Sequence, residues 1–210
     1  MSSKALKEII AGLKDGRDIA PLKKAVAKKY GLSRIPTNPQ ILAAARAKDR
    51  IFLEPLLRKK PVRTISGIAV IAVMARPYEC PGRCIYCPTG KDSPKSYTGK
   101  EPATMRAKRA GYDPYLQVRD RINQLRQIGH ITDKAELIVM GGTFTSQPLD
   151  YQEWFVKRCI VAMNSFSGKI EWNTLEDAQE VNEKAEVRNV GITFETRPDY
   201  AKEKEADRML

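Results

Sequence analysis

The stretch TISGIAVIAVMA, residues 64–75, decides the fold of this 210-residue chain. It is a nearly unbroken apolar run rich in isoleucine and valine, which is typical of a strand covered on both faces in a parallel sheet. Two similar runs follow along the chain, AELIVMGG at 135–142 and VGITFE at 190–195. We therefore expect three buried strands at these positions.

Segments with helical spacing alternate with these strands. Asp113 is predicted to cap a helix, residues 150–164 are amphipathic, and Thr174 begins a further helix with an imperfect capping box. Residues 202–210 also have a helical rhythm. The alternation predicts right-handed crossovers and a parallel sheet, either open and doubly wound or part of a (β/α) barrel. Because three strands cannot close a barrel, we expect the chain to hold only the first part of such a domain.

The N-terminal segment, residues 1–63, holds most of the positive charge. It has 16 Lys and Arg against 5 Asp and Glu, a net charge of +11, whereas residues 64–210 carry +1 of the total of +12. Its apolar spacing predicts helices throughout, one of them capped by Asn38. We therefore predict two domains, with a basic helical segment at 1–63 that binds a polyanion such as nucleic acid. A basic surface that is merely solvated is the alternative.

Neither a secretion signal nor a membrane segment is predicted. The start, MSSKALKEII, lacks a basic-then-apolar pattern, and the longest apolar run, residues 65–75, is shorter than the roughly 20 residues that cross a bilayer. Four cysteines without regular pairing argue against a disulfide-stapled secreted domain. The expectation is a cytoplasmic protein with reduced thiols and no membrane contact.

A long loop, expected to run from the first strand to about Gly111, holds three of the four cysteines. These are Cys80, Cys84 and Cys87. Structural zinc requires four ligands, but His130 is expected at the surface or at a helix end and Cys159 in an apolar core. Three thiolates alone suit a four-iron, four-sulfur cluster whose fourth iron keeps an open position. Zinc or a purely structural cluster is the alternative.

The cysteine spacing, C-x-x-x-C-x-x-C with the aromatic Tyr86 before the last cysteine, is the pattern of radical S-adenosylmethionine enzymes. In those enzymes the amine and carboxylate of the cofactor bind the open iron, and one electron cleaves the sulfonium to give a 5′-deoxyadenosyl radical. The loop follows the carboxyl end of the first strand, where reactive sites of (β/α) architectures lie. The position of the cysteines is therefore consistent with this chemistry.

Candidate cofactor residues follow the other two strands. Gly141 and Gly142 would let a ligand approach the backbone, although a simple tight turn would also explain them. Thr143 comes next, where radical S-adenosylmethionine enzymes often carry Glu. Glu195 and Arg197 follow the third strand and could reach the cofactor or substrate, an ion pair at a strand end being the alternative.

Four motifs together closely resemble the catalytic subunit of Elongator, in particular its single-chain archaeal and bacterial forms. They are CPGRCIYCPTG at 80–90, SYTGKEPATMRAKRAGYDPYLQ at 96–117, IVMGGTF at 138–144 and ITFETRPDY at 192–200. The resemblance implies an α/β fold in which a basic helical segment precedes the first part of a radical S-adenosylmethionine partial barrel, at 64–210. It also implies that the three loop cysteines hold a 4Fe-4S cluster and that Gly141 and Gly142 flank S-adenosylmethionine.

By the same resemblance, the chain would belong to a transferase that builds a carboxymethyl group on carbon 5 of the wobble uridine of tRNA, with acetyl-CoA as co-substrate. Lysines and arginines are candidates for contacts with tRNA phosphates, and tyrosines of the long loop for stacking on bases or for packing. The basic candidates are Lys23, Lys24, Lys28, Lys29, Arg58, Lys59, Lys60, Arg106, Lys108 and Arg109. The tyrosines are Tyr97, Tyr112 and Tyr115. Catalytic residues are not assigned.

The sequence departs from the family pattern in two ways. The interval between the first two cysteines is shorter than in eukaryotic members, and the barrel of the family continues beyond Leu210 into an acetyltransferase-like domain that binds acetyl-CoA. We therefore expect no full turnover from this chain alone. The family implies a homodimer in archaeal and bacterial forms and other Elongator subunits in eukaryotes. Alternative functions are acetylation of protein lysines, or a non-catalytic, metal-stabilised module that binds nucleic acid.

Overall fold

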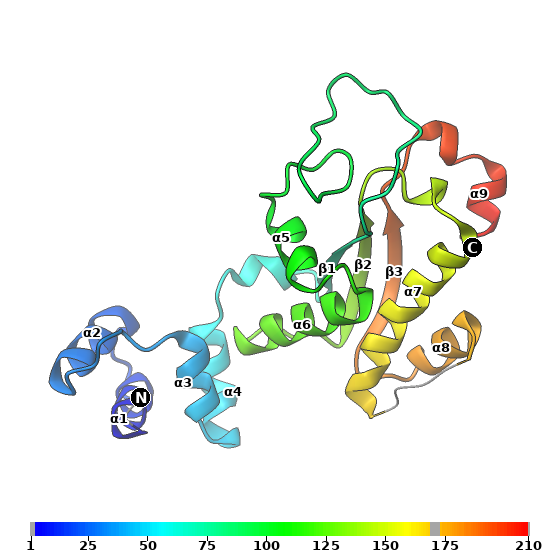
Figure 1. Ribbon diagram of the computed structural model, residues 1–210. Coiled ribbons are helices and arrows are strands. Elements are labelled where there is room, and N and C mark those ends of the chain that lie inside the picture. The colour runs from blue at the N-terminus through cyan, green and yellow to red at the C-terminus, as the bar shows by residue number, and fades with distance from the viewer. Residues whose placement is uncertain (1–2, 169–172, 210) are drawn as a thin grey trace. The chain divides into compact units, whose positions relative to one another are not determined.

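The computed structural model describes residues 3–168 and 173–209. The chain divides into two compact units, one built from helices and one from a parallel sheet with helices (Figure 1). The first unit comprises Met1–Ile65 and Gln124–Ile131, and the second comprises Ser66–Asn123 and Thr132–Leu210. Within the described residues, no helix is long and apolar enough to span a bilayer.

The helical unit has a core of its own. Its helices are α1 (Ser3–Lys14), α2 (Ile19–Lys29), α3 (Asn38–Ala44) and α4 (Ala47–Leu57), followed by a 3-10 turn, Pro61–Thr64. Ile9, Ile41 and Leu53 are fully buried in one apolar cluster to which all four helices contribute. Burial of this apolar surface holds the short helices together, since helices of this length are marginal alone in water.

The predicted cap of α3 is wrong by one residue. Thr37 is the cap: its hydroxyl accepts a bond from the Gln40 backbone N–H at 3.4 Å, and the Gln40 side chain accepts one from the Thr37 N–H at 2.9 Å. Asn38 instead donates to the Leu57 carbonyl at 2.8 Å and accepts from Lys23 Nζ at 3.0 Å. This Thr-x-x-Gln capping box satisfies two backbone donors, one more than a lone asparagine cap.

His130 is buried, at 4% exposure, so the expected surface position is wrong. Its Nδ1 lies 2.9 Å from the Thr64 hydroxyl and its Nε2 2.9 Å from the Lys59 carbonyl. Beside it, Arg58 Nε donates to the Gly129 carbonyl at 2.7 Å. The imidazole therefore ties residues 59–64 to the end of the Gln124–Ile131 segment.

The second unit contains the predicted parallel sheet. Its strands are β1 (Ala69–Met74), β2 (Lys134–Met140) and β3 (Arg188–Phe194), in the order β1-β2-β3. Ala69 lies opposite Ala135, and Leu137 lies opposite Ile192, so the three carboxyl ends share one edge of the sheet. The first strand is shorter than the apolar run 64–75 because Thr64 ends a 3-10 turn and residues 65–67 form a turn in which Gly67 has a φ of +80°.

Helices connect the strands as the alternation predicts. They are α5 (Pro102–Arg109), α6 (Pro114–Gln127), α7 (Leu149–Asn164), α8 (Leu175–Asn182) and α9 (Glu203–Asp207). Asp113 caps α6, accepting from the Leu116 N–H at 2.9 Å, and both bonds of the Thr174 capping box are present. The helix expected at 202–210 is confined to α9, and Leu210 lies outside the described residues.

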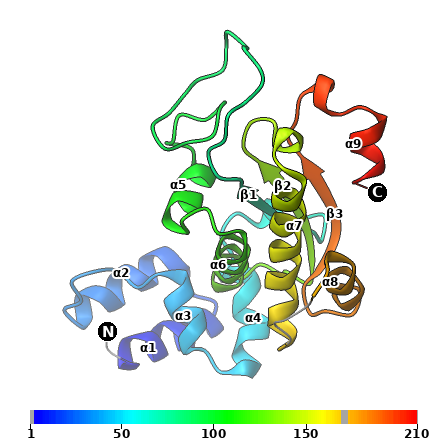
Figure 2. The ribbon, with the colours of Figure 1, turned by 45° about the vertical axis from the view of Figure 1, so that its right-hand side comes forward.

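The two faces of the sheet are buried to different extents. Figures 1 and 2 show α6 and α7 on one face, and Ile71, Leu137 and Val139 are fully buried. The residues that alternate with them are more exposed: Val70 is 41% exposed, and Ile138 is half-buried. The prediction of cover on both faces is therefore wrong for the part of the chain that the structure describes.

Candidate cofactor site at the strand ends

Residues 75–101, between β1 and α5, form a loop without helix or strand, and this loop carries the three clustered cysteines. The loop is shorter than predicted because α5 occupies residues that the sequence assigned to it. Tyr97 anchors it: the ring is 9% exposed in a cluster with Met74 and Ala107, and its hydroxyl donates to the Glu195 carboxylate. Burial, then this bond, raises the pKa of Tyr97 well above its ordinary value.

Each loop thiol contacts a different polar partner. Cys80 Sγ lies 3.3 Å from the Thr143 hydroxyl, and Cys84 Sγ accepts from Arg197 Nη1 at 3.6 Å. Cys87 Sγ lies 3.1 Å from the Ser96 hydroxyl. All four cysteines lie in the described residues and are unpaired thiols. Two of the predicted cofactor residues, Thr143 and Arg197, therefore contact two of the predicted cluster ligands.

The three thiols are not gathered into a ligand set. Among the described residues, no three His, Cys, Asp or Glu side chains are arranged to hold a metal ion. The chemistry of the donors nevertheless fits an iron–sulfur cluster, since three half-buried thiols lie on a loop that no regular structure holds rigid. Bringing the sulfur atoms to one cluster requires the loop at 75–101 to rearrange.

Gly141 and Gly142 form a turn that only glycine adopts easily. Their φ angles are +125° and +77°, in the region that disfavours side chains. A Cβ on Gly141 would lie 3.3 Å from the Ala75 Cβ, and one on Gly142 would lie 3.4 Å from the Lys95 carbonyl oxygen. The turn therefore packs closely against both ends of the cysteine loop. Close approach by a ligand remains a prediction.

Arg197 fixes one side of the cysteine loop. Its guanidinium forms two bonds with Asp199, Nε to Oδ1 at 2.9 Å and Nη2 to Oδ2 at 2.8 Å, and this pairing raises its pKa. An ion pair thus exists at this strand end, but Arg197 forms it with Asp199, whereas the Glu195 carboxylate accepts from the Tyr97 hydroxyl. A Cβ on Gly82 would lie 1.6 Å from Arg197 Nη1. The loop backbone therefore approaches this side chain so closely that only glycine fits at position 82 while the side chain stays in this position. No local pattern singles out Gly82, and Asp199 is identified from the sequence only as part of the motif ITFETRPDY.

Tyr86 is the most exposed of the predicted cofactor residues. Its side chain is 83% exposed, and the neighbouring Ile85 is fully exposed. A hydrogen bond with the Cys84 thiol raises the pKa of the Tyr86 phenol. The structure therefore places Tyr86 beside a predicted ligand, on the outer side of the loop.

Cys159 and the aromatic residues of α7 belong to the core. The Cys159 thiol is fully buried, and burial raises its pKa, so the prediction of an inert core thiol is confirmed. Phe144, directly after the Gly141–Thr143 turn, stacks on Phe194 at 5.4 Å between ring centroids and meets Phe155 edge-on at 5.5 Å. This aromatic cluster packs directly after the Gly141–Thr143 turn and helps to hold it in place.

The basic residues of the helical unit fall into two groups. Side chains bound within the unit include Lys29, which pairs with Glu8 at 2.8 Å, and Arg58 and Lys23, whose bonds are given above. Burial lowers the pKa of Lys23, and Lys59 beside it adds to this effect. Of the basic residues predicted to contact tRNA, the other four in this unit are exposed: Lys24, Lys28, Lys59 and Lys60.

Three basic candidates lie on α5 in the second unit. Lys108 Nζ donates to the Lys91 carbonyl at 2.8 Å and so binds the cysteine loop. Arg106 is half-buried, and Arg109 is exposed. Of the three, Arg109 has the position that best suits an external phosphate.

These features define the class of protein. Three parallel strands, with polar and sulfur-bearing side chains converging beyond their carboxyl ends, form the beginning of a barrel-type α/β domain, and a basic helical unit accompanies it. Residues 1–65 match the ELP3 N-terminal domain.

The chain is also similar to known proteins over most of its length. It is 55% identical over 181 residues to the tRNA uridine(34) acetyltransferase of Methanocaldococcus infernus, covering 83% of this chain and 33% of that protein. It is 44% identical over 218 residues to Elongator complex protein 3 of Bos taurus, covering 98% and 39%. The solved structure of Methanocaldococcus infernus Elp3 with an N-terminal deletion matches with a TM-score of 0.50 and 42% identity, covering 68% of this chain and 26% of that one.

The chain is therefore similar to Elp3 proteins over most of its length, and the match to the ELP3 N-terminal domain lies at residues 1–65. It spans about a third to two fifths of the length of these curated relatives.

Proposed function

We propose that this chain is the N-terminal part of an Elongator-type enzyme that modifies the wobble uridine of tRNA by radical S-adenosylmethionine chemistry. In this proposal the helical unit binds tRNA, and the strand ends of the α/β unit hold a 4Fe-4S cluster and S-adenosylmethionine. A carboxymethyl group at carbon 5 is the proposed product. Acetyl-CoA, the proposed co-substrate, would bind in a part of the relatives that this chain does not span.

One observation carries the proposal. The cysteine loop, the Gly141–Gly142 turn and Arg197 come together beyond the carboxyl ends of three parallel strands, with Cys80 3.3 Å from Thr143 and Cys84 3.6 Å from Arg197. Side chains that follow β2 and β3 therefore contact two thiols of the loop that follows β1. Sites of α/β proteins lie at this edge because the loops there come from several strands.

The residues of the chain would divide the work as follows. Cys80, Cys84 and Cys87 would each hold one iron, which leaves the fourth iron open for the amine and carboxylate of S-adenosylmethionine. When bound, the cluster supplies the electron that cleaves this cofactor to a 5′-deoxyadenosyl radical. The Gly141–Gly142 turn, which has no side chains, would let the cofactor approach the end of β2.

Charge and hydrogen bonding at the third strand would orient the cofactor. Arg197 is held by Asp199 in a two-bond pair, so its guanidinium is a fixed cation beside Cys84. A cation there would offset the negative charge of thiolate ligands. Tyr97 holds the Glu195 carboxylate in place, and the bond keeps that carboxylate available as an acceptor for the cofactor ribose or ammonium.

The proposal for tRNA rests on the charge of the helical unit. Lys24, Lys28, Lys59 and Lys60 are exposed, and the segment 1–63 carries a net charge of +11. Exposed lysines attract phosphates and release the counterions condensed on RNA, which gives affinity that falls with salt. The relative from Methanocaldococcus infernus is named a tRNA uridine(34) acetyltransferase, which supports an RNA partner.

The test is anaerobic reconstitution of the chain with iron and sulfide. We expect brown protein with about four irons per chain, which on reduction forms 5′-deoxyadenosine from S-adenosylmethionine. Colourless protein that retains stoichiometric zinc would contradict the cofactor proposal and favour a structural metal. Binding of tRNA is measured separately on the same preparation, because the two halves of the proposal can fail independently.

A further inference from the structure

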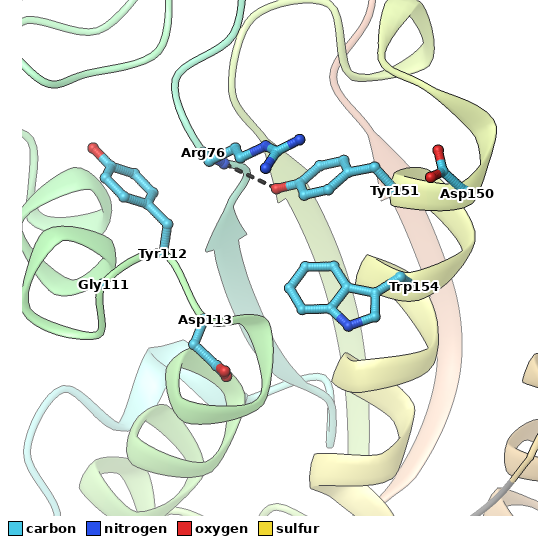
Figure 3. A pocket seen from close by; sticks show the side chains of 7 residues that line it. All are labelled: Arg76, Gly111, Tyr112, Asp113, Asp150, Tyr151 and Trp154. Atoms are coloured by element: carbon cyan, nitrogen blue, oxygen red, sulfur yellow. Dashed lines mark hydrogen bonds between the residues drawn. The ribbon is translucent and has the colours of Figure 1, made fainter.

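A hollow on the α/β unit lies outside the proposed cofactor site. Its volume is about 600 Å³, and it is open to solvent between the start of α6 and the first turns of α7, beside the end of β1 (Figure 3). The side chains that line it are Arg76, Tyr112, Asp113, Asp150, Tyr151 and Trp154. All of them belong to one unit of the chain. Volumes of this size are typical of ligand sites, about 300–1,000 Å³.

Aromatic surface dominates the hollow. Figure 3 shows the indole of Trp154 reaching from α7 toward the start of α6, below Tyr151. Trp154 is 41% exposed although its centroid lies only 5.5 Å from that of the buried Tyr151. A large aromatic side chain left this exposed inside a concavity is a platform for stacking rather than part of the core.

Tyr151 and Arg76 form a rigid upper wall. The Tyr151 hydroxyl accepts from the Arg76 backbone N–H at 3.1 Å, and the Arg76 guanidinium lies over the Tyr151 ring at 4.4 Å (Figure 3). A stacked guanidinium uses its face, which leaves the N–H groups in its plane as donors for a phosphate. The wall therefore combines ring surface with one cation.

The carboxylates make the hollow unsuitable for an isolated anion. Asp113 accepts from the Leu116 N–H as the cap of α6 and lies 3.7 Å from Arg158, while Asp150 is exposed in the first turn of α7. Arg158 offsets Asp113, so Arg76 and Asp150 leave the lining without a net positive charge, and a phosphate needs further contacts from an attached group to bind there. A flat neutral ring that carries N–H donors and is attached to a phosphate meets all of these groups favourably.

We propose that this hollow binds an unstacked nucleobase of single-stranded RNA, with the base on Trp154 and its phosphate toward Arg76. Bases of RNA loops are recognised by stacking on aromatic rings and on arginine planes. A carboxylate such as that of Asp113, which Figure 3 shows beside the indole, accepts from the amino or imino groups of a base. The inference rests on the proposed tRNA-binding function and adds a contact on the α/β unit, separate from the lysines of the helical unit.

The test uses Trp154 as its own reporter. The other tryptophan, Trp172, lies outside the described residues and is replaced by phenylalanine, so that emission comes from Trp154 alone. The chain is titrated with an unmodified tRNA anticodon stem–loop and with uridine, cytidine, adenosine and guanosine monophosphates. We expect the stem–loop to quench the emission, because a base stacked on the indole replaces water.

Variants of the stacking residue give the size of the effect. Trp154→Ala should weaken stem–loop binding about fivefold to 150-fold, the range for loss of one base stack, and Trp154→Phe should weaken it less. Leu149→Ala is the matched control, since Leu149 is 57% exposed at the start of the same helix and does not line the hollow. Thermal unfolding of each variant verifies that it folds.

The possible results separate this inference from the function on which it rests. Quenching together with the Trp154→Ala loss supports the base site. If the stem–loop binds without a change in emission, and Trp154→Ala binds it with the same affinity, the base site is overturned while tRNA binding stands. The hollow would then be left to a protein partner. If the unsubstituted chain binds no RNA at all, the proposed tRNA function fails and the base site fails with it.

Discussion

The helical unit and the cysteine loop of the α/β unit hold their functional side chains in opposite ways. In the helical unit a fully buried core that includes Ile9 and Leu53 fixes the helices, and lysines such as Lys24 stand exposed on this rigid base. The loop at 75–101 has no regular structure, and single polar contacts hold its thiols. A surface that attracts RNA by charge can be formed in advance, whereas a site that receives an iron–sulfur cluster must let its ligands move.

The largest effect is expected when one thiol is removed from the loop. Cys84→Ser should lower bound iron after anaerobic reconstitution from about four atoms per chain to near background, because three thiolates are the minimum set for the cluster. Affinity for tRNA should stay within about twofold, since surface substitutions away from an interface change binding by a few tenths of a kcal/mol.

Cys159→Ala is the matched control for this variant, since Cys159 is a thiol in the core. It should keep its iron and lose only some stability. Equal loss of iron from both variants, measured by metal analysis, would mean that the loop thiols have no special role.

A smaller effect is expected from the exposed lysines of α2. Reversing Lys24 and Lys28 to glutamate should reduce the slope of log affinity against log salt by about 2 if each contacts one phosphate. The measurement is tRNA binding over a salt series. The amount of iron bound after reconstitution should not change. This result would show that the helical unit and the cysteine loop serve different partners.

The control for charge reversal uses Lys134 and Lys184, two exposed lysines of the α/β unit. Their reversal changes the net charge equally, so a purely global charge effect would appear in both double variants. An equal decrease of the salt slope in both double variants would contradict the proposal that the helical unit binds tRNA.

Gly82 and Arg197 test how the loop is held. Arg197→Ala should decrease the alkylation rate of Cys84 in the metal-free protein several-fold, because the thiolate is the reactive form and the cation that contacts Sγ is lost. Gly82→Ala should have a similar effect, since the new Cβ would displace the Arg197 side chain. The double variant should be no slower than either single one, because both changes break one contact. Additive rates, followed by mass spectrometry of the alkylated peptide, would contradict this coupling.

The smallest effect concerns Glu101 at the junction of the loop with α5. Its carboxylate accepts from the Thr98 N–H at 2.9 Å, from the Gly99 N–H at 3.0 Å and from the Thr98 and Thr104 hydroxyls, and these bonds lower its pKa to about 2. A lowered pKa means that the stabilisation is complete above the unfolded value near 4.5 and is lost as pH falls toward 2. Glu101→Gln should therefore lower the melting temperature at neutral pH by a few degrees at most, and the difference should vanish near pH 2.

The exposed Glu153 on α7 serves as the comparison for Glu101. Glu153→Gln should leave the melting temperature unchanged at neutral pH. A Glu101→Gln difference that persists undiminished down to pH 2 would show that the charge of the carboxylate is irrelevant there.

The sequence could predict the elements whose signals are local. Apolar runs located the three strands, and the Asp113 and Thr174 caps follow from residues within one turn. The cap of α3 was misplaced because Thr37 and Asn38 are both good caps and only the position of Gln40 decides between them.

Features that depend on distant contacts could not be predicted. His130 is buried and forms hydrogen bonds with Thr64 and with the Lys59 carbonyl, both more than sixty residues away in sequence. The contacts of the candidate site, Cys84 with Arg197 and Tyr97 with Glu195, likewise join distant segments. The motifs identified Cys84, Glu195 and Arg197 as candidates, but their pairing requires the fold.

The central claim is that the three loop thiols hold a cluster with an open iron. Its most direct test is the electron paramagnetic resonance spectrum of the reconstituted, reduced chain before and after addition of S-adenosylmethionine. The account predicts the signal of a reduced four-iron centre that changes when the cofactor is added. A four-iron signal that ignores the cofactor, or no such signal in protein that has taken up metal, would contradict it.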